Sequence, residues 1–229
     1  MLDVDLFITA IVKEEWENGG KIPSENELAK KYRVPRVYVR KALKTLDDMG
    51  YTYSVQGKGR YLQKKKSKIT LPLTGSESFT QKMKNEKLHL KTKLLTFEKV
   101  KSNQYPFIKK LNEEYVWKVE RLRVVEGEPL ALHTSYVSYQ LFPQLDQEVE
   151  QLTSMFAYYQ SKGMKQFKSS ESVLSTSFPT TEEKSTLQCA SLTPLIIVSS
   201  NCINAETNEW LEVTKIVYRS DCFLFNIQT

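Results

Sequence analysis

Three basic residues, Arg36, Arg40 and Lys44, recur at four-residue intervals in the stretch VPRVYVRKALKTL. Residues four apart share one face of an α-helix, so these side chains should project together. The segment 30–44 holds seven basic residues and no acidic one, and six more basic residues without an acid follow in 57–68. Arginine forks can bind guanine O6 and N7, and lysines neutralise phosphates, so the pattern favours DNA as the partner. A basic helix face alone is more often simply solvated, and the interpretation therefore depends on the features around it.

A second candidate site contains Arg121 and Arg123, which lie two residues apart in a β-prone run. Side chains at i and i+2 of a strand share one face, so two guanidinium groups there suit a carboxylate or a phosphate. The alternative is that both arginines form ion pairs on a solvent-exposed face, with Glu120, Glu126 or Glu128 as partners. The sequence pattern alone leaves both interpretations open.

Residues for covalent or metal chemistry are sparse. The three cysteines, Cys189, Cys202 and Cys222, are scattered without CxxC spacing, which argues against a disulfide framework and against a zinc site. The chain has two histidines, no Ser/His/Asp order and no cluster of metal ligands. We therefore expect no catalytic residue, no metal and no cofactor.

Charge is divided unevenly along the chain. Residues 1–70 hold fifteen Lys and Arg against nine Asp and Glu, whereas residues 71–229 hold eighteen of each, so the net charge of +6 arises in the first part. Such asymmetry is typical of a polyanion-binding module joined to a neutral one. The absence of a long apolar run and of signal-peptide features favours a soluble, cytoplasmic protein with no membrane partner.

Short helices followed by a hairpin are predicted in residues 1–65. The expected helices span 6–16, 24–32 and 35–49. Ser24 and Glu27 form a capping-box pattern, Pro35 suits the first turn of the third helix, and Gly50 suits its end. The apolar face of that helix contains Val39, Ala42, Leu43, Leu46 and Met49. Two β-prone runs then flank a glycine-rich turn, so the segment predicts a winged helix-turn-helix DNA-binding domain.

After a basic, polar linker at 66–74, the pattern changes to strands with interspersed helices. The expected strands are 94–100, 115–125, 130–139, 172–178, 195–204, 210–218 and 223–227. The expected helices are 77–85, 107–111, 153–161 and 181–189. Turn signals around Gly127 and Asn208 indicate hairpins between neighbouring strands. Residues 75–229 are therefore predicted as an α+β domain with a mainly antiparallel sheet.

The stretch IPSENELAKKYRVPRVYVRKALKTLDDMGYTYSVQGKGRYL resembles the GntR-type bacterial transcription regulators. Their pattern runs PSE, then ELA, then V-S-R-x-x-V-R-x-A-L, then a G-x-G wing. In that family the Ser and Glu of PSE, the arginines of the third helix and the wing glycines contact DNA. The resemblance and the charge pattern together predict a DNA-binding set of Ser24, Glu25, Arg36, Tyr38, Arg40, Lys44, Gly57, Lys58, Gly59 and Arg60.

Three positions depart from the family pattern. Pro35 stands where the family usually has Ser, and this removes a hydroxyl and an N–H that could each bind a phosphate. Arg60 stands where the family usually has Thr and is expected to restore the lost charge from the wing. Tyr38 replaces a small polar residue, and two roles stay open for it: contact with a thymine methyl or a phosphate, or simple packing.

The stretch WKVERLRVVEGEPLALHTSYVSYQLFPQL resembles UTRA, the effector-binding domain of the HutC-like branch of that family, which shares its fold with chorismate lyase. The likeness continues through LTSMFAYY and LEVTKIVYRSD. In relatives that bind sugar phosphates, an arginine pair, the amides of the first helix and a Ser hold the phosphate, while other side chains face the sugar. The resemblance implies a ligand site of Phe79, Thr80, Arg121, Arg123, His133, Ser154, Phe156, Glu212 and Tyr218. His133 replaces a usual Glu and Phe156 a usual Tyr, so the phosphate end is better preserved than the sugar end.

The resulting hypothesis is a ligand-responsive transcription regulator, most simply a repressor. It is expected to bind a palindromic operator as a homodimer and to be released by a small anionic effector, a sugar phosphate or an organic acid. The expected domains are 1–65 for DNA binding and 75–229 for effector binding and dimerisation. Two rivals remain: an enzyme related to chorismate lyase, with Arg123 and Glu212 as its acid-base groups, and a DNA-binding dimer whose pocket is vestigial.

Overall fold

Capping residues determine where the first described helices begin. In the computed structural model, α2 (Glu25–Tyr32) starts at Ser24, whose Oγ accepts a hydrogen bond from the Glu27 N–H, while the Glu27 carboxylate accepts one from the Ser24 N–H. The predicted capping box is therefore confirmed.

The structure describes residues 8–10, 20–63, 68–72 and 77–226. Residues 8–10 are helical, and the rest of the helix expected over 6–16 lies outside the described residues.

Helix α3 (Arg36–Asp48) follows Pro35, which is its N-cap residue. At the other end, the Gly50 N–H donates to Asp47 O and the Tyr51 N–H to Leu46 O, which is the Schellman arrangement. This motif needs a left-handed residue after the helix, and Gly50 has φ +78°. Met49, expected on the apolar face, is instead exposed because it lies past the last helical residue.

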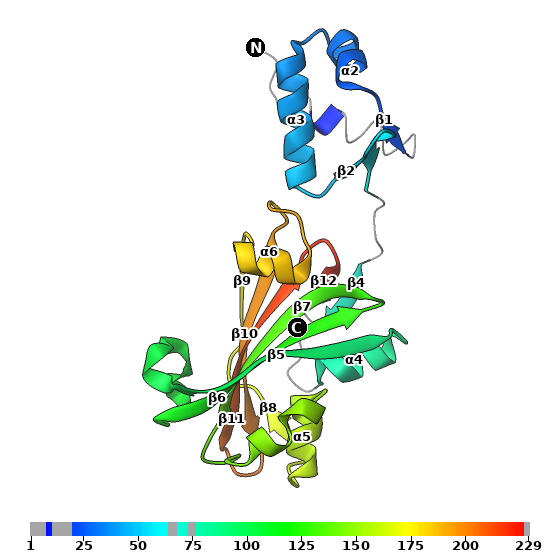
Figure 1. Ribbon diagram of the computed structural model, residues 1–229. Coiled ribbons are helices and arrows are strands. Elements are labelled where there is room, and N and C mark those ends of the chain that lie inside the picture. The colour runs from blue at the N-terminus through cyan, green and yellow to red at the C-terminus, as the bar shows by residue number, and fades with distance from the viewer. Residues whose placement is uncertain (1–7, 11–19, 64–67, 73–76, 227–229) are drawn as a thin grey trace. The chain divides into compact units, whose positions relative to one another are not determined.

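The wing hairpin completes the first unit. Strands β2 (Thr52–Val55) and β3 (Gly59–Leu62) pair antiparallel, and the short β1 (Lys21–Ile22) adds to β3, so the sheet order is β1-β3-β2. Strand β1 was not predicted, because two residues carry no periodicity. Apolar side chains from both helices and the sheet form one small core: Ile22, Leu28, Val39, Ala42, Leu43, Leu46 and Leu62. The predicted winged helix-turn-helix is confirmed (Figure 1).

The chain divides into two compact units. The first contains Met1–Ser67 together with Phe178–Thr193, and the second contains Lys68–Ser177 with Pro194–Thr229. The returning segment of the first unit carries α6 (Thr181–Leu187), which begins with a second capping box. Ile69–Pro72, inside the stretch expected to be a linker, forms strand β4 and pairs in parallel with β12 (Phe223–Asn226).

A large sheet forms the second unit, and all its strand pairs are antiparallel (Figure 1). Its order is β5-β6-β7-β11-β10-β8, with β9 also paired to β10. The strands are β5 (Leu90–Lys101), β6 (Tyr115–Val125), β7 (Glu128–Ser138), β8 (Phe167–Lys168), β9 (Val173–Ser177), β10 (Leu195–Asn204) and β11 (Trp210–Arg219). The predicted α+β fold is confirmed, although the two-residue strand β8 was missed.

Short helices connect and cover these strands. They are α4 (Phe79–Asn85), α5 (Met155–Ser161) and 3-10 turns at Ser102–Gln104, Pro106–Leu111, Leu145–Gln147 and Val149–Gln151. The turn between β6 and β7 has positive φ at both Glu126 and Gly127, the geometry that suits a tight hairpin. This hairpin, together with a register shift between Arg123 and Val124, places Arg121 opposite His133. Among the described helices, none is both long and apolar enough to cross a membrane.

Candidate DNA-binding face and ligand cavity

The two faces of α3 have different surroundings, as its sequence predicts. Val39, Ala42, Leu43 and Leu46 are buried in the small core, and Leu46 is 0% exposed. Arg36, Arg40 and Lys44 are exposed on the other side. The helix therefore presents a basic face whose position is held by burial of the opposite face.

Glu25 organises the two arginines of this face. Its carboxylate accepts a hydrogen bond from Arg36 Nε at 2.8 Å and from Arg40 Nη2 at 3.3 Å. These hydrogen bonds lower the pKa of Glu25, which keeps the carboxylate ionised. Glu25 thus pairs with the arginines across the helix-turn-helix, while Ser24 is used as the helix cap. The sequence assigned both residues to DNA contact, and that assignment stays a prediction.

The wing presents backbone and charge at its tip. Gly57 and Gly59 have φ of +72° and +115°, values that other residues rarely adopt, and Lys58 between them is exposed. A Cβ on Gly59 would meet the flexible end of the Lys21 side chain, with Cε at 2.9 Å, so the positive φ values are the main reason for glycine here. These two glycines are therefore required by the turn itself, which is sufficient reason for the G-x-G pattern.

Arg60 has a different environment from the one expected for a DNA contact. Its Nη1 lies 2.7 Å from an Asp47 carboxylate oxygen and donates to Leu43 O at 2.6 Å, and 23% of the side chain is exposed. Thr52 also donates to Asp47, so both wing strands are tied to the end of α3. Tyr38 is 46% exposed on the basic helix, which removes core packing as its role.

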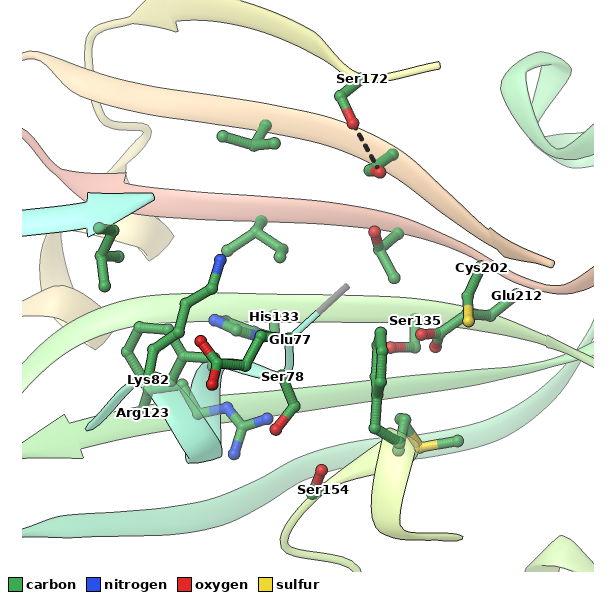
Figure 2. A pocket seen from close by; sticks show the side chains of 18 of the residues that line it. Glu77, Ser78, Lys82, Arg123, His133, Ser135, Ser154, Ser172, Cys202 and Glu212 are labelled. Atoms are coloured by element: carbon green, nitrogen blue, oxygen red, sulfur yellow. Dashed lines mark hydrogen bonds between the residues drawn. The ribbon is translucent and has the colours of Figure 1, made fainter. Parts of the chain in front are cut away.

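A cavity lies over one face of the large sheet, between the sheet, α4 and α5 (Figure 2). Its volume is about 130 Å³, which suits a small metabolite. The predicted ligand residues that line it are Phe79, Arg121, Arg123, His133, Ser154, Phe156, Glu212 and Tyr218. Thr80 is the exception, since it is absent from the wall and its Oγ1 lies 3.4 Å from Thr153 O. Two residues of the expected amide segment, 75 and 76, lie outside the described residues.

Both arginines of the predicted pair are buried, each 3% exposed. Arg121 Nη2 donates to Ser135 Oγ at 3.0 Å, and Arg123 Nη1 donates to Thr92 Oγ1 at 2.6 Å and to Thr153 O at 2.7 Å. Three of their nitrogens, Arg121 Nε, Arg121 Nη1 and Arg123 Nε, have no protein hydrogen-bond partner. The alternative of solvent-facing ion pairs with neighbouring glutamates is therefore wrong.

This concentration of buried charge shifts the pKa of the groups around it. Burial lowers the pKa of Arg123 well below its usual value, and the charge of Arg121 lowers it further. Burial raises the pKa of Glu212, although the charge of Arg121 opposes this shift. Glu212 is one carboxylate beside two buried cations, so part of the cost of burying their charge remains, and a bound anion would offset it. The cavity is therefore suited chemically to an acidic ligand.

Two polar wall residues that the sequence did not reveal, Ser135 and Lys82, extend the site beside the predicted Ser154. Ser135 lies two residues after His133 on β7, so the strand period could have indicated it. Lys82 lies one helical turn after Phe79 on α4, and only the packing of α4 on the sheet shows that it reaches the cavity. Ser154 caps α5 and accepts a hydrogen bond from the Ala157 N–H at 3.4 Å.

Comparison with known families agrees with both units. Residues 85–223 match the family described as UTRA domain, and residues 5–62 match bacterial regulatory proteins of the gntR family. The transcriptional repressor NagR of Bacillus subtilis is 25% identical over 219 residues, which cover 95% of this chain and 88% of that protein. The mannosyl-D-glycerate transport/metabolism system repressor MngR of Escherichia coli is 28% identical over 141 residues, which cover 61% of this chain and 58% of that protein.

Solved structures show the same fold. PhnF from Mycobacterium smegmatis has a TM-score of 0.63 at 22% sequence identity, with 92% of each chain covered. At this identity the likeness supports the fold alone. The curated relatives are named as transcription regulators and not as enzymes, which argues against the chorismate-lyase-like rival.

Proposed function

Because the chain belongs to the GntR family of bacterial transcription regulators and carries a UTRA domain, we propose that it is a repressor released from its operator by a small anionic metabolite. The operator is palindromic and the protein binds it as a homodimer, since two-fold symmetry of the site mirrors that of the protein. Residues 1–65 contact DNA, and residues 75–229 bind the effector and dimerise.

The DNA-binding part of the proposal is carried by the exposed basic face of α3. Arg36 and Arg40 enter the major groove and bind guanine edges, while Lys44 and the wing Lys58 neutralise phosphates. On binding, the arginines exchange some of their contact with Glu25 for contact with bases. Arg60 contributes by holding the wing against α3 through Asp47.

The effector part is carried by the buried arginine pair with its unpartnered N–H groups. A sugar phosphate would place its phosphate at Arg121, Arg123 and Ser154 and its hydroxyls toward Glu212 and Tyr218. The names of two kinds of relative, which refer to mannosyl-D-glycerate and to fructoselysine utilisation, support a sugar-related ligand. If the effector binds the DNA-free form of the protein about 1.4 kcal/mol more tightly than the DNA-bound form, the affinity for the operator falls tenfold.

Two matched substitutions on α3 test the DNA assignment. Arg40→Ala should reduce discrimination between operator and random DNA, by about 1–3 kcal/mol for a lost bidentate base contact. Lys44→Ala should instead weaken both DNAs equally and lower the salt dependence of binding. Unchanged operator preference of the Arg40→Ala protein in a footprint would exclude base recognition by this residue.

Arg123→Ala tests the effector site. The variant should bind operator as the parent protein does and should not be released by sugar phosphates. If no phosphorylated sugar or organic acid raises the melting temperature of the parent protein, the vestigial-pocket rival is favoured.

A further inference from the structure

The middle of the exposed face of α3 carries an apolar side chain, Val37. The buried residues of this helix, Val39, Ala42, Leu43 and Leu46, share the opposite side. At 3.6 residues per turn, Val37 lies about 170° around the helix from the centre of that buried set. It is 67% exposed. Val37 therefore points directly away from the core, at the centre of the face that the helix presents to a partner.

Positive charge surrounds this valine. Arg40 and Lys41 follow it by three and four positions, so both are its neighbours on the helix surface, and both are exposed. Lys44 extends the same face one turn further, and the first turn of α3 contains no acidic residue. An apolar group enclosed by cations is poorly suited to an apolar protein surface, because such a contact would bury the charges. The face instead suits a polyanion that itself carries an apolar group.

The position of Val37 in the helix distinguishes it from an ordinary exposed valine. Single exposed apolar residues are common on protein surfaces, so exposure by itself indicates nothing. Val37, however, is the second residue of α3, after the N-cap Pro35, and the N-terminal residues of a recognition helix are the ones that reach base edges. Valine is also a weaker helix former than alanine. Neither core packing nor helix formation therefore accounts for this side chain.

The chemistry of the major groove indicates which base an isopropyl group can recognise. Base edges there present hydrogen-bond donors and acceptors, and the thymine C5-methyl is the apolar group among them. Val37 has no donor or acceptor, so against any other base edge it would remove water from polar atoms without replacing the lost hydrogen bonds. Thymine is therefore the best match for Val37.

Helix geometry limits where that thymine can lie. Side chains three positions apart on a helix have Cβ atoms about 5–6 Å apart, which applies to Val37 and Arg40. Successive bases of one DNA strand rise by about 3.4 Å. The two side chains are therefore expected to contact bases within about two base pairs of each other.

We propose that Val37 determines operator specificity by packing against the C5-methyl of a thymine, within two base pairs of the guanine that Arg40 binds. This inference rests on the proposed function, because it takes α3 as the helix that enters the major groove. It adds an apolar contact to a surface otherwise composed of cations, and it requires thymine at one position of the operator half-site.

Deoxyuridine tests the contact, since it differs from thymidine only by the missing methyl group. Full-length protein first selects its operator from random duplexes, and the guanine is the position at which Arg40→Ala loses its base preference. Each thymine within two base pairs of that guanine is then replaced in turn. One replacement in a half-site should weaken binding about fourfold, as expected when one methyl group is no longer buried.

Variants assign the methyl effect to Val37. Val37→Ser should bind the thymine and the deoxyuridine operators equally, because the apolar contact is already absent. Val37→Ile keeps an apolar group and should retain the loss of about fourfold. Lys41→Ala is the matched control beside Val37: it should weaken binding to both operators alike and leave the methyl effect unchanged. All three substitutions lie on the exposed face, outside the core.

The outcomes separate this inference from the proposed function. If the protein enriches no sequence, operator recognition is refuted and the Val37 contact with it. If an operator is selected and Arg40→Ala loses its preference, but no thymine in the window is sensitive to loss of its methyl, only the Val37 contact is refuted. A methyl effect that persists in Val37→Ser would also refute it, because another residue would then make the contact.

Discussion

The burial of His133 predicts a stability that depends on pH in a specific direction. Burial holds the pKa of His133 well below its usual 6.5, and the charges of Arg123, Arg121 and Lys82 add to that effect. The unfolded chain takes up a proton near pH 6.5, whereas the folded protein does so only at lower pH. The contribution of neutral His133 to the free energy of unfolding is therefore complete above pH 6.5, and it is lost as the pH falls below that value.

As long as His133 stays unprotonated in the folded protein, the loss of stability depends only on the pKa of this histidine in the unfolded chain. At pH 5.5, one unit below that pKa, the linkage removes at most about 1.4 kcal/mol from the free energy of unfolding, and at pH 7.5 it removes almost nothing. For a unit of this size, the change corresponds to roughly 3–5 °C in melting temperature. His133→Gln should lack this component, because glutamine does not titrate.

Urea unfolding of the parent protein and the variant at pH 7.5 and 5.5 measures the difference. Carboxylates titrate in both proteins, so their contribution cancels in the comparison. His89→Gln is the matched control, since His89 is the other histidine of the chain and is exposed. The parent and the His89→Gln protein should lose more stability on acidification than His133→Gln. Equal losses in all three proteins would refute the assignment of a depressed pKa to His133.

Three further predictions concern the DNA-binding unit. Leu46→Ala should lower the free energy of unfolding by about 2–5 kcal/mol in urea titrations, because Leu46 is fully buried and leaves a cavity. Asp47→Asn should change stability by less than about 1 kcal/mol, since its ion pair with Arg60 is partly exposed, yet weaken operator binding in gel shifts by loosening the wing. Gly59→Ala should cost about 1–3 kcal/mol by thermal unfolding because of its φ of +115°; an unchanged melting temperature would contradict the strained turn.

Departures from the family pattern are interpreted differently once the contacts are known. Arg60 was expected to supply phosphate charge in place of the features lost at Pro35. Its contacts with Asp47 and with the Leu43 carbonyl link the wing to α3, and its role at a phosphate stays a prediction. Tyr38, by contrast, is exposed and remains available to DNA, so it and Pro35 are the positions where operator preference is expected to differ from that of relatives.

Local signals in the sequence determined most of the elements. The 3.6-residue period placed Val39, Leu43 and Leu46 inside and the arginines outside, and the capping box at Ser24 fixed the start of α2. Strands β6 and β10 begin and end at the predicted residues, because runs rich in β-prone residues are bounded there by turn residues. Two-residue strands such as β1 lack any such pattern and form only because a neighbouring strand is already in place.

The chemistry of the cavity was decided by tertiary structure. Two arginines spaced by two residues could have faced solvent or a pocket, and only the packing of α4 and α5 over the sheet buries Arg121 and Arg123 and leaves some of their N–H groups without a partner. The same packing brings Lys82 to His133, which lies 51 positions later in the chain. Periodicity along a chain describes which side chains share a face, whereas burial and charge in a cavity depend on which faces meet, and that is a property of the folded protein.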